Sequence, residues 1–293
     1  MNEIPCYYAL LHNVLTFFSF AFGACVGSFL NVCIYRIPRE LSVIKPRSHC
    51  ISCGKTIPWY LNIPIISYLF LRGKCRFCGA KFSPRYLVVE ILTAFLFMMV
   101  WLKVIYPYGP FWGMTPLSDI RLVPVYWLII GGLLLGTFVD FEYLIIPDRV
   151  TLGGIVAGLI ISAILPSLHN TNSHLLSITY SVVGAALGWL VLWLIGFFGT
   201  IIFKKEAMGF GDVKLIGAIG AFLGWKAVLF TIAVSSFFGA IVGIILVLSR
   251  CKEMQSKIPY GPYLSLAAVI WIFWGEKLLQ IYLNILSPPD IGI

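Results

Sequence analysis

The stretch that decides the fold is LVPVYWLIIGGLLLGTFVDFEYLIIPD, which runs from Leu122 to Asp148. Its first part, residues 122–139, contains no charged residue. That part is long enough to cross a bilayer as a helix, for which roughly 20 apolar residues are needed. The carboxylate of Asp140 follows directly. Because hydrocarbon strongly disfavours charge, a carboxylate at the edge of such a helix indicates a functional role.

A second carboxylate occupies the same kind of position. The run GFGD, from Gly209 to Asp212, precedes a short and mostly apolar stretch that reaches Gly224. Gly209 and Gly211 permit backbone conformations closed to other residues and allow another chain to approach closely. Two carboxylates at the mouths of hydrophobic segments favour a pair that shares one proton and activates water. We therefore predict Asp140 and Asp212 as catalytic groups supported by the two glycines, although GxGD alone can arise by chance in a glycine-rich chain.

The composition of the whole chain is that of a membrane protein. Of its 293 residues, 60% are hydrophobic and only 11% are charged, and the mean hydropathy is +0.94. In soluble domains about a quarter of the residues are charged. We predict an all-α polytopic membrane protein with about eight transmembrane helices, the shortest directly after GFGD. The other predicted spans are residues 14–34, 87–105, 122–139, 150–165, 175–203, 227–248 and 264–283.

Basic residues indicate which loops face the cytoplasm. The loop between the first and second spans is rich in lysine and arginine, an excess typical of the inside. No basic residue precedes the first span and RIPR follows it from Arg36, which favours a retained helix over a cleaved signal peptide. Because successive spans cross the membrane in opposite directions, Asp140 and Asp212 then lie on the cytoplasmic side, provided that the short span after GFGD also crosses the membrane. The later inside loops hold Arg149, Lys204, Lys205, Arg250, Lys252 and Lys257.

The net charge of +9 follows from this distribution. Its basic residues are spread among membrane loops, so they indicate topology and attraction to anionic lipid. They do not indicate a nucleic-acid partner. Membrane lipid is the predicted partner of these loops.

The loop at residues 36–85 contains two Cys-x-x-Cys-Gly sequences, formed by Cys50 with Cys53 and Cys75 with Cys78. Two such pairs are typical of a tetrahedral zinc site. Four cysteines leave no open coordination position, so the zinc would be structural. Disulfides are the alternative, but the reducing cytoplasm disfavours them. A loop with few large aliphatic side chains buries little core, so zinc would supply folding energy for this small cytoplasmic zinc-knuckle domain.

Three further acidic residues lie near the predicted pair or inside a span. Glu142 lies in the turn after Asp140 and could contact the pair. Asp148 follows a helix-breaking proline and is predicted to cap the next span. Glu90 lies just inside the second span, where a carboxylate usually has a partner, such as Arg85 or a facing polar group. The sequence does not define the roles of Glu90 and Glu142.

Several motifs occur together along the chain. They are GSFLNVCIYRIPR from Gly27, the two cysteine pairs, DFEYLIIPD from Asp140, MGFGDVKL from Met208 and IPYGPYLSLA from Ile258. In order and spacing they resemble the prepilin peptidases, membrane aspartyl proteases that process type IV pilins and type II secretion pseudopilins. The resemblance covers nearly the whole chain.

The resemblance implies that Asp140 and Asp212 are the catalytic pair. It also implies cleavage of a short basic leader after a glycine, at the cytoplasmic face of the bacterial inner membrane. N-methylation of the new terminus with S-adenosylmethionine is expected, because the four-cysteine loop is found in the bifunctional members. Glu142 and Tyr143 stand where aspartate and histidine are frequent in the family. Neither is one of the catalytic pair, so these differences bear on the fine tuning of the site rather than on whether it is active.

The implied domains are a transmembrane helix in residues 1–35, the zinc domain in residues 36–85 and a membrane-embedded aspartyl peptidase core in residues 86–293. The chain shows no nucleotide-binding fingerprint that would locate the S-adenosylmethionine site. It also does not name the prepilin or pseudopilin that is processed, or give the oligomeric state.

Other classes of protein remain as alternatives. A presenilin-like GxGD intramembrane protease shares the aspartate chemistry, but it would carry tyrosine before the partner aspartate, where Val139 stands. A transporter would place polar groups near the bilayer midplane and repeat its halves, and neither feature is evident. A non-enzymatic scaffold would tolerate the loss of both aspartates.

Overall fold

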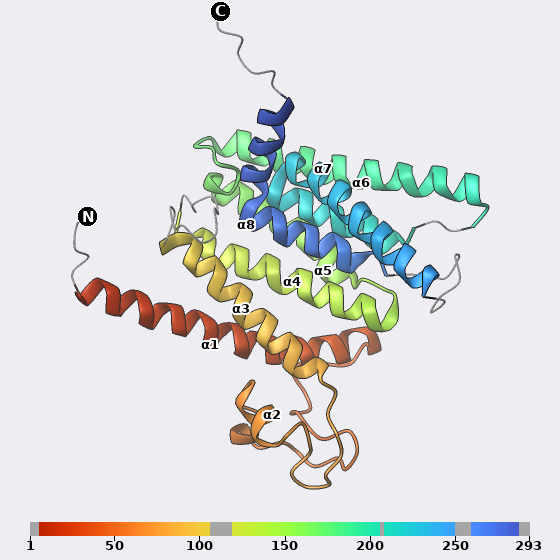
Figure 1. The fold of residues 1–293 in the computed structure, drawn as a ribbon. Helices are drawn as coiled ribbons and strands as arrows, with labels where there is room; N and C mark the ends of the chain where they lie inside the picture. Colours follow the sequence, from red (N-terminus) through yellow and green to blue (C-terminus); the bar gives the residue numbers. More distant parts are fainter. Residues whose placement is uncertain (1–5, 106–118, 206–207, 250–258, 287–293) are drawn as a thin grey trace, which may run out of the picture. The chain divides into compact units, whose positions relative to one another are not determined.

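The computed structural model describes residues 6–105, 119–205, 208–249 and 259–286 (Figure 1). These residues form helices and turns, with two isolated β-bridges and no strand, so the all-α prediction is confirmed. The chain divides into two compact units, Met1–Ile105 with Val123–Leu135, and Tyr106–Leu122 with Gly136–Ile293. Helix α4, Leu122–Tyr143, contributes residues to both units.

In the first unit, helix α1, Cys6–Arg36, packs closely against helix α3, Arg85–Ile105. A Cβ atom at Gly23 would lie 2.8 Å from the Cα atom of Ala94, and one at Gly27 would lie 2.8 Å from the Cα atom of Glu90. Small residues four positions apart let membrane helices approach to backbone contact. The two glycines therefore determine how closely α1 and α3 pack.

Aromatic side chains join the first half of α4 to this pair of helices. The indole N–H of Trp127 donates a hydrogen bond to the carbonyl oxygen of Phe97 at 3.0 Å. The rings of these two residues stack with centroids 5.1 Å apart, and Phe22 of α1 lies with its ring centroid 5.3 Å from that of Trp127. Such contacts add to the stabilisation from apolar burial.

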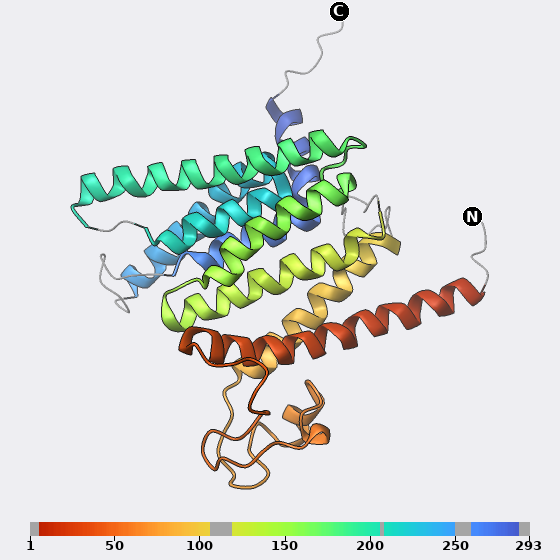
Figure 2. The same ribbon diagram turned by 180° about the vertical axis from the view of Figure 1, so that it is seen from behind.

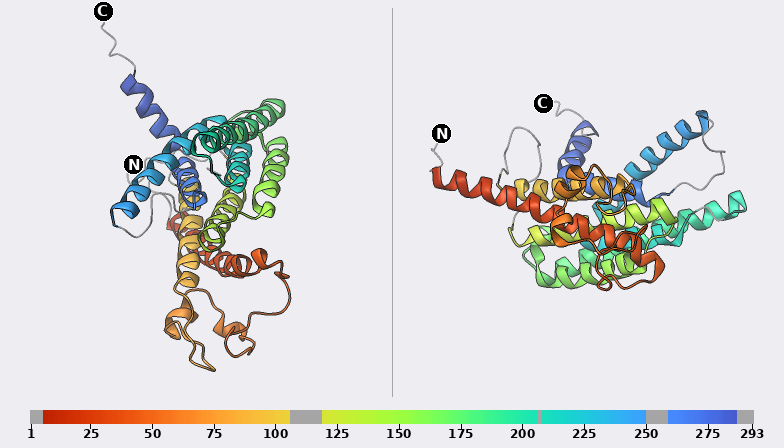
Figure 3. Two further views of the ribbon diagram at one scale, coloured as in Figure 1. Left: turned by 90° about the vertical axis from the view of Figure 1, so that its right-hand side faces the viewer. Right: turned by 90° about the horizontal axis from the view of Figure 1, so that it is seen from below.

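A loop-rich segment connects α1 to α3 within the first unit (Figure 3). Its short helices are η1 (Ile37–Arg39), η2 (Trp59–Leu61) and α2 (Ile66–Phe70). The buried guanidinium group of Arg36 donates to the carbonyl oxygens of Ser42 and Pro46, at 2.9 and 2.8 Å. These charge-assisted hydrogen bonds fasten the start of the segment to the end of α1.

The second unit is a set of tightly packed helices. They are α5 (Asp148–Ile164), η3 (Pro166–His169), α6 (His174–Phe203), α7 (Phe210–Leu248) and α8 (Gly261–Leu286). Helix α6 runs beside α7 in opposite views (Figure 1, Figure 2). A Cβ atom at Gly188 would lie 2.8 Å from the carbonyl oxygen of Ile216, and one at Gly184 would overlap the backbone of Gly220. Glycine at this seam lets the two helices meet at backbone distance.

Helix α7 is two helices separated by a turn at Gly224. Its φ of 78° and ψ of 176° are not helical, and glycine adopts such a conformation without the steric cost that other residues pay. The side chain of Val228 would lie 2.9 Å from a Cβ atom at Gly220. In a continuous helix these two positions would be roughly 12 Å apart along the axis. The chain therefore folds back at Gly224.

Six helices in the described part of the chain are long and apolar enough to cross a membrane: α1, α3, α4, α6, α7 and α8. Helix α5 is shorter, with 17 residues. With α5 included and α7 counted as two halves, the described chain has eight apolar helical segments. This agrees with the predicted number and with the short span after GFGD. Of the residues used to predict topology, Arg250, Lys252 and Lys257 lie outside the described residues.

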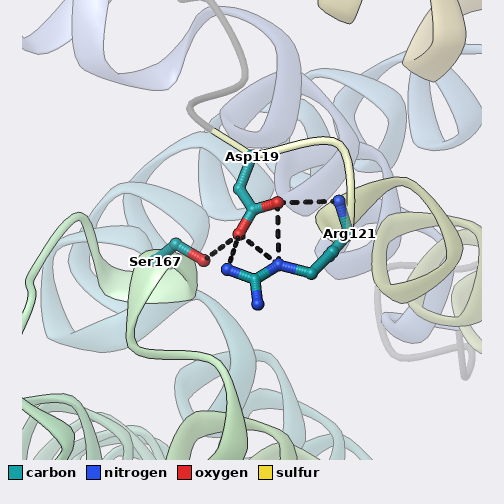
Figure 4. Close-up of polar contacts among 3 residues, drawn as sticks. All are labelled: Asp119, Arg121 and Ser167. Carbon is teal, nitrogen blue, oxygen red and sulfur yellow. Dashed lines mark hydrogen bonds and ion pairs between the residues drawn. The ribbon is translucent and has the colours of Figure 1, made fainter.

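Successive helices of the second unit run in opposite directions, so the loops between them lie at two ends. Contacts among Asp140, Ile146, Gly211 and Gly261 and the pair of Asp148 with Lys214 place the last turn of α4 and the starts of α5, α7 and α8 at one end. The other end holds η3, whose His169 lies next to the turn at Gly224. At the η3 end, the carboxylate of Asp119 accepts hydrogen bonds from Arg121 and, at 3.1 Å, from the hydroxyl of Ser167 (Figure 4). The Arg121 guanidinium is the main cause that lowers the pKa of Asp119 to about 2. Asp119 therefore stays ionised at any physiological pH.

Candidate active site and metal centre

Asp140 lies in the last turn of α4, with 5% of its surface exposed. Its Oδ2 atom accepts a hydrogen bond from the backbone N–H of Gly261 at 3.0 Å. Gly261 is the first residue of α8, where backbone N–H groups have no partner within the helix and carry partial positive charge. This contact joins the end of α4 to the start of α8, 121 residues further along the chain.

Asp212 is the third residue of α7, after Gly209 at the N-cap position. Its surface is 8% exposed, and its Oδ1 atom has no hydrogen-bond partner among the described residues. The carboxylate lies near enough to Asp140 for an electrostatic interaction between them. A buried carboxylate oxygen without a partner is costly. A water molecule or a substrate group at this position would supply the missing hydrogen bond.

Ile146 packs between the segments that carry the two aspartates. A Cβ atom at Gly211 would lie 3.2 Å from the Cβ atom of Ile146. At Gly261, a Cβ atom would lie 3.0 Å from Cδ1 of Ile146 and 2.8 Å from Oδ2 of Asp140. Any larger residue at Gly261 would therefore press on both neighbours. The buried Ile146 side chain and the two glycines together determine how closely α4, α7 and α8 meet.

The two other acidic residues predicted to support the pair are exposed. Glu142 lies on the outer side of the last turn of α4. The Oδ1 atom of Asp148 lies 2.6 Å from Nζ of Lys214, and the Asp148 side chain is 61% exposed. The prediction that Asp148 caps the next helix is wrong, because Pro147 occupies the N-cap position and Asp148 is the first residue of α5. Its charge instead links the first residue of α5 to Lys214, the fifth residue of α7.

Sequence reasoning did not assign roles to Ile146 and Gly261. Both lie in motifs that the sequence analysis had quoted, DFEYLIIPD and IPYGPYLSLA, of which Ile258 is outside the described residues. The motifs were thus a signal that these segments matter. Which backbone group meets which carboxylate depends on how α4 and α8 pack.

The four cysteines of the first unit meet at one point. The Sγ atoms of Cys50, Cys53, Cys75 and Cys78 all lie within 4.8 Å of one another, and those of Cys50 and Cys78 are 3.8 Å apart. Four Zn–S bonds of about 2.3 Å in a tetrahedron place the sulfurs about 3.8 Å apart. All four are free thiols rather than disulfides. The donor set therefore has the size and chemistry of a structural zinc site.

Each cysteine pair forms the same turn. The N–H of Gly54 donates to the carbonyl oxygen of Cys50 at 2.8 Å, and the N–H of Gly79 donates to that of Cys75 at 2.9 Å. Both glycines have positive φ, at 70° and 72°, a region that favours glycine. A hydrogen bond from the backbone of Cys53 is the main cause that lowers the pKa of Cys50 to about 6. This favours the metal-binding thiolate form of Cys50 at neutral pH. For Cys78, a hydrogen bond from the backbone of Ala80 lowers the pKa, but desolvation and hydrogen bonds with the other three cysteines outweigh it and raise the pKa to about 11.

Comparisons with known proteins cover both units. The bacterial peptidase A24 N-terminal domain matches residues 21–104, and the type IV leader peptidase family matches residues 127–244. A prepilin leader peptidase/N-methyltransferase of Aeromonas hydrophila is 35% identical, over 90% of this chain and 92% of that protein. Proteins of the same name from Pseudomonas putida and Myxococcus xanthus are 32% and 36% identical, over 97% and 85% of this chain and 96% and 67% of their own. No solved structure matches the chain.

Proposed function

This chain belongs to the type IV leader peptidase family, and from that premise we propose that Asp140 and Asp212 cleave the leader peptide of prepilins or pseudopilins. The observation that carries the proposal is the pair of buried carboxylates at the ends of α4 and α7, with Oδ1 of Asp212 lacking a partner among the described residues. The named relatives combine a peptidase with an N-methyltransferase. We propose the same two activities here.

The proposed cleavage needs no covalent intermediate. One carboxylate, deprotonated, takes a proton from a water molecule held between the pair, while its protonated partner donates to the scissile carbonyl or leaving amine. The hydroxide adds to the carbonyl carbon, the C–N bond breaks, and the amine leaves with the donated proton. The N–H of Gly261 holds one oxygen of Asp140 throughout. Burial of both aspartates strengthens these electrostatic effects, because the local dielectric is low.

We place the active site on the cytoplasmic face of the bacterial inner membrane. Arg149, Lys204 and Lys205 lie at the same end of the second unit as the aspartates, which is the arrangement expected of an inside face. The hydrophobic helix of a prepilin would then lie in lipid beside the enzyme. Its basic leader would project into the cytoplasm and reach the two carboxylates at the membrane edge.

We propose zinc at the four cysteines as a structural ion that holds together the loop-rich segment between α1 and α3. That segment has no large core of its own, and its two cysteine turns come from residues well apart in sequence. Binding of metal would therefore be part of its folding. We further propose S-adenosylmethionine as methyl donor. When bound, it supplies an activated methyl group for the new terminal amine.

The decisive experiment compares two asparagine variants in a membrane-reconstituted cleavage assay. Asp140→Asn and Asp212→Asn each keep side-chain size but remove an acid–base group, so we expect a loss of cleavage of at least about a thousandfold. Glu276→Gln is the matched control, since it neutralises a carboxylate on α8 and keeps an acceptor for Asn170. Substantial cleavage by either asparagine variant would refute the assignment and would mean that other groups carry out the reaction.

A further inference from the structure

The first unit contains a cavity of about 450 Å³, bordered by the cysteine-bearing loops and the adjoining ends of α1 and α3. Its volume falls within the range of roughly 300–1,000 Å³ that small-molecule sites occupy. Aromatic and charged groups share its lining. Among them are Tyr35, Tyr68, Phe82, Arg85, Tyr86 and Glu90.

Glu90 is the buried acid of this lining, with 7% of its surface exposed. Its Oε2 atom accepts a hydrogen bond from the backbone N–H of Ile65 at 2.7 Å. The hydroxyl of Ser28 is within hydrogen-bonding reach of the same carboxylate. Both donors are neutral, so they orient the carboxylate without cancelling its charge. A carboxylate that is buried in this way is suited to a cationic ligand.

The backbone that orients Glu90 is itself strained. Ile65 has a φ of 64° and a ψ of −56°, and it directly precedes α2. A β-branched residue rarely adopts positive φ, because its side chain collides with the backbone. Such strain is typically found at ligand-binding and catalytic sites, where the surrounding structure maintains it. Here it directs the N–H of Ile65 at a carboxylate on the cavity wall.

We propose that this cavity binds S-adenosylmethionine and that the Glu90 carboxylate pairs with the sulfonium cation. The inference rests on the proposed function, which supplies the methyl donor. Phe82 offers an apolar surface for the adenine. The rings of Tyr35 and Tyr86 already carry the guanidinium groups of Arg39 and Arg85, 4.0 and 5.1 Å from their centroids, so the sulfonium pairs with the carboxylate. Arg85 on the same wall offers a guanidinium group for the carboxylate of the methionine part.

The charge of the ligand provides a direct test, since S-adenosylhomocysteine lacks the sulfonium. Binding of both compounds is measured by equilibrium dialysis on the full chain in nanodiscs. Glu90→Gln keeps an acceptor for the N–H of Ile65 but removes the charge. We expect S-adenosylmethionine to bind at least about tenfold more weakly to this variant, since the sulfonium loses its charged partner. S-adenosylhomocysteine should change by less than about threefold.

Glu40→Gln is the control, because Glu40 is an exposed acid of the same unit and does not line the cavity. It should leave both affinities unchanged. If the unsubstituted protein binds neither compound, the methyl-donor part of the proposed function fails. If it binds both and Glu90→Gln keeps the preference for the cation, only the assignment of Glu90 fails.

A second measurement does not depend on the folding of a variant. Radiolabelled S-adenosylmethionine is crosslinked to the unsubstituted protein with ultraviolet light, and the labelled peptides are mapped by mass spectrometry. We expect the label between Tyr35 and Glu90. Label confined to peptides of the second unit would overturn the site.

Discussion

At the scale of single residues, Gly261 is the glycine near the aspartates at which an added side chain would have the least room. Its N–H holds Asp140, and a methyl group there would lie 2.8 Å from Oδ2 of Asp140. We predict that Gly261→Ala displaces this carboxylate or the start of α8. Misplacement of about 1 Å costs on the order of a hundredfold in rate. Steady-state cleavage of a prepilin should therefore show kcat reduced by about that factor.

Gly239→Ala is the control for this prediction. A methyl group at Gly239 would lie 3.8 Å from the ring of Tyr260, an ordinary van der Waals contact close to the same helix start. Its kcat should stay near that of the unsubstituted protein. If Gly261→Ala cleaves at the unsubstituted rate, the contact with Asp140 does not position the catalytic group.

The proposed catalytic aspartates could be predicted from the sequence, whereas the contacts that position them could not. Asp140 and Asp212 stand out because charge next to an apolar span is rare, and that is a local property. The contact of Asp140 with Gly261 joins residues 121 positions apart, and it depends on tertiary packing. For Asp148 the local sequence was misleading. The proline before it predicted a helix cap, but in the folded chain its carboxylate forms an ion pair with Lys214.

At the scale of helices, the seam between α6 and α7 should tolerate no side chain. A Cβ atom at Gly220 would overlap the backbone of Gly184. We predict that Gly220→Ala lowers the free energy of unfolding by about 1–3 kcal/mol, the usual cost of overpacking. Thermal unfolding in detergent would measure this. Gly153→Ala on α5, where the added methyl group meets no neighbour within 4 Å, should not destabilise the protein.

The turn at Gly224 has a consequence for topology. If α7 crosses and returns, Lys226 lies at the opposite face from Lys204, and both side chains are exposed. We predict that in intact cells a membrane-impermeant maleimide labels Lys226→Cys but not Lys204→Cys. After the cells are opened, both should react above the background of the native cysteines. Failure of Lys226→Cys to react in intact cells would contradict the fold-back.

Hydropathy predicted the helices because each span must satisfy its backbone hydrogen bonds internally, so apolar length and helical structure coincide. The short span could be predicted as a segment of its own, since a glycine and a tryptophan-lysine pair interrupt the apolar run at Gly224. The turn itself could not be derived, because glycine also occurs within membrane helices. The contact of Val228 with Gly220 is a tertiary feature of the folded chain.

At the scale of the whole molecule, the proposed zinc should stabilise one unit selectively. We predict one zinc per chain by elemental analysis and less than half of that in Cys50→Ser combined with Cys53→Ser. Removal of the metal should make residues 36–84 sensitive to protease, since their turns depend on the metal. The helices of the second unit should keep their protection. Undiminished metal in the double variant would refute the site.

His169 is the group whose burial should make the stability of the second unit depend on pH. Burial lowers the pKa of His169 to about 4. Its Nε2 atom lies 3.1 Å from the hydroxyl of Ser162, and its ring lies near that of Tyr180. Both neighbours are neutral. The folded state therefore keeps this imidazole neutral at pH values where an unfolded chain, with a histidine pKa of about 6.5, takes up a proton.

The sign of the effect follows from this difference. Between about pH 6.5 and pH 4 the unfolded chain binds more protons than the folded one, so stability falls as the pH is lowered through that range. We predict a loss of at most about 3 kcal/mol, measured as a falling unfolding temperature. His169→Gln should remove this slope, whereas His174→Gln, at an exposed position near the start of α6, should keep it. A slope that survives His169→Gln would have to come from carboxylates, whose protonation weakens the ion pairs of the folded state over the same range.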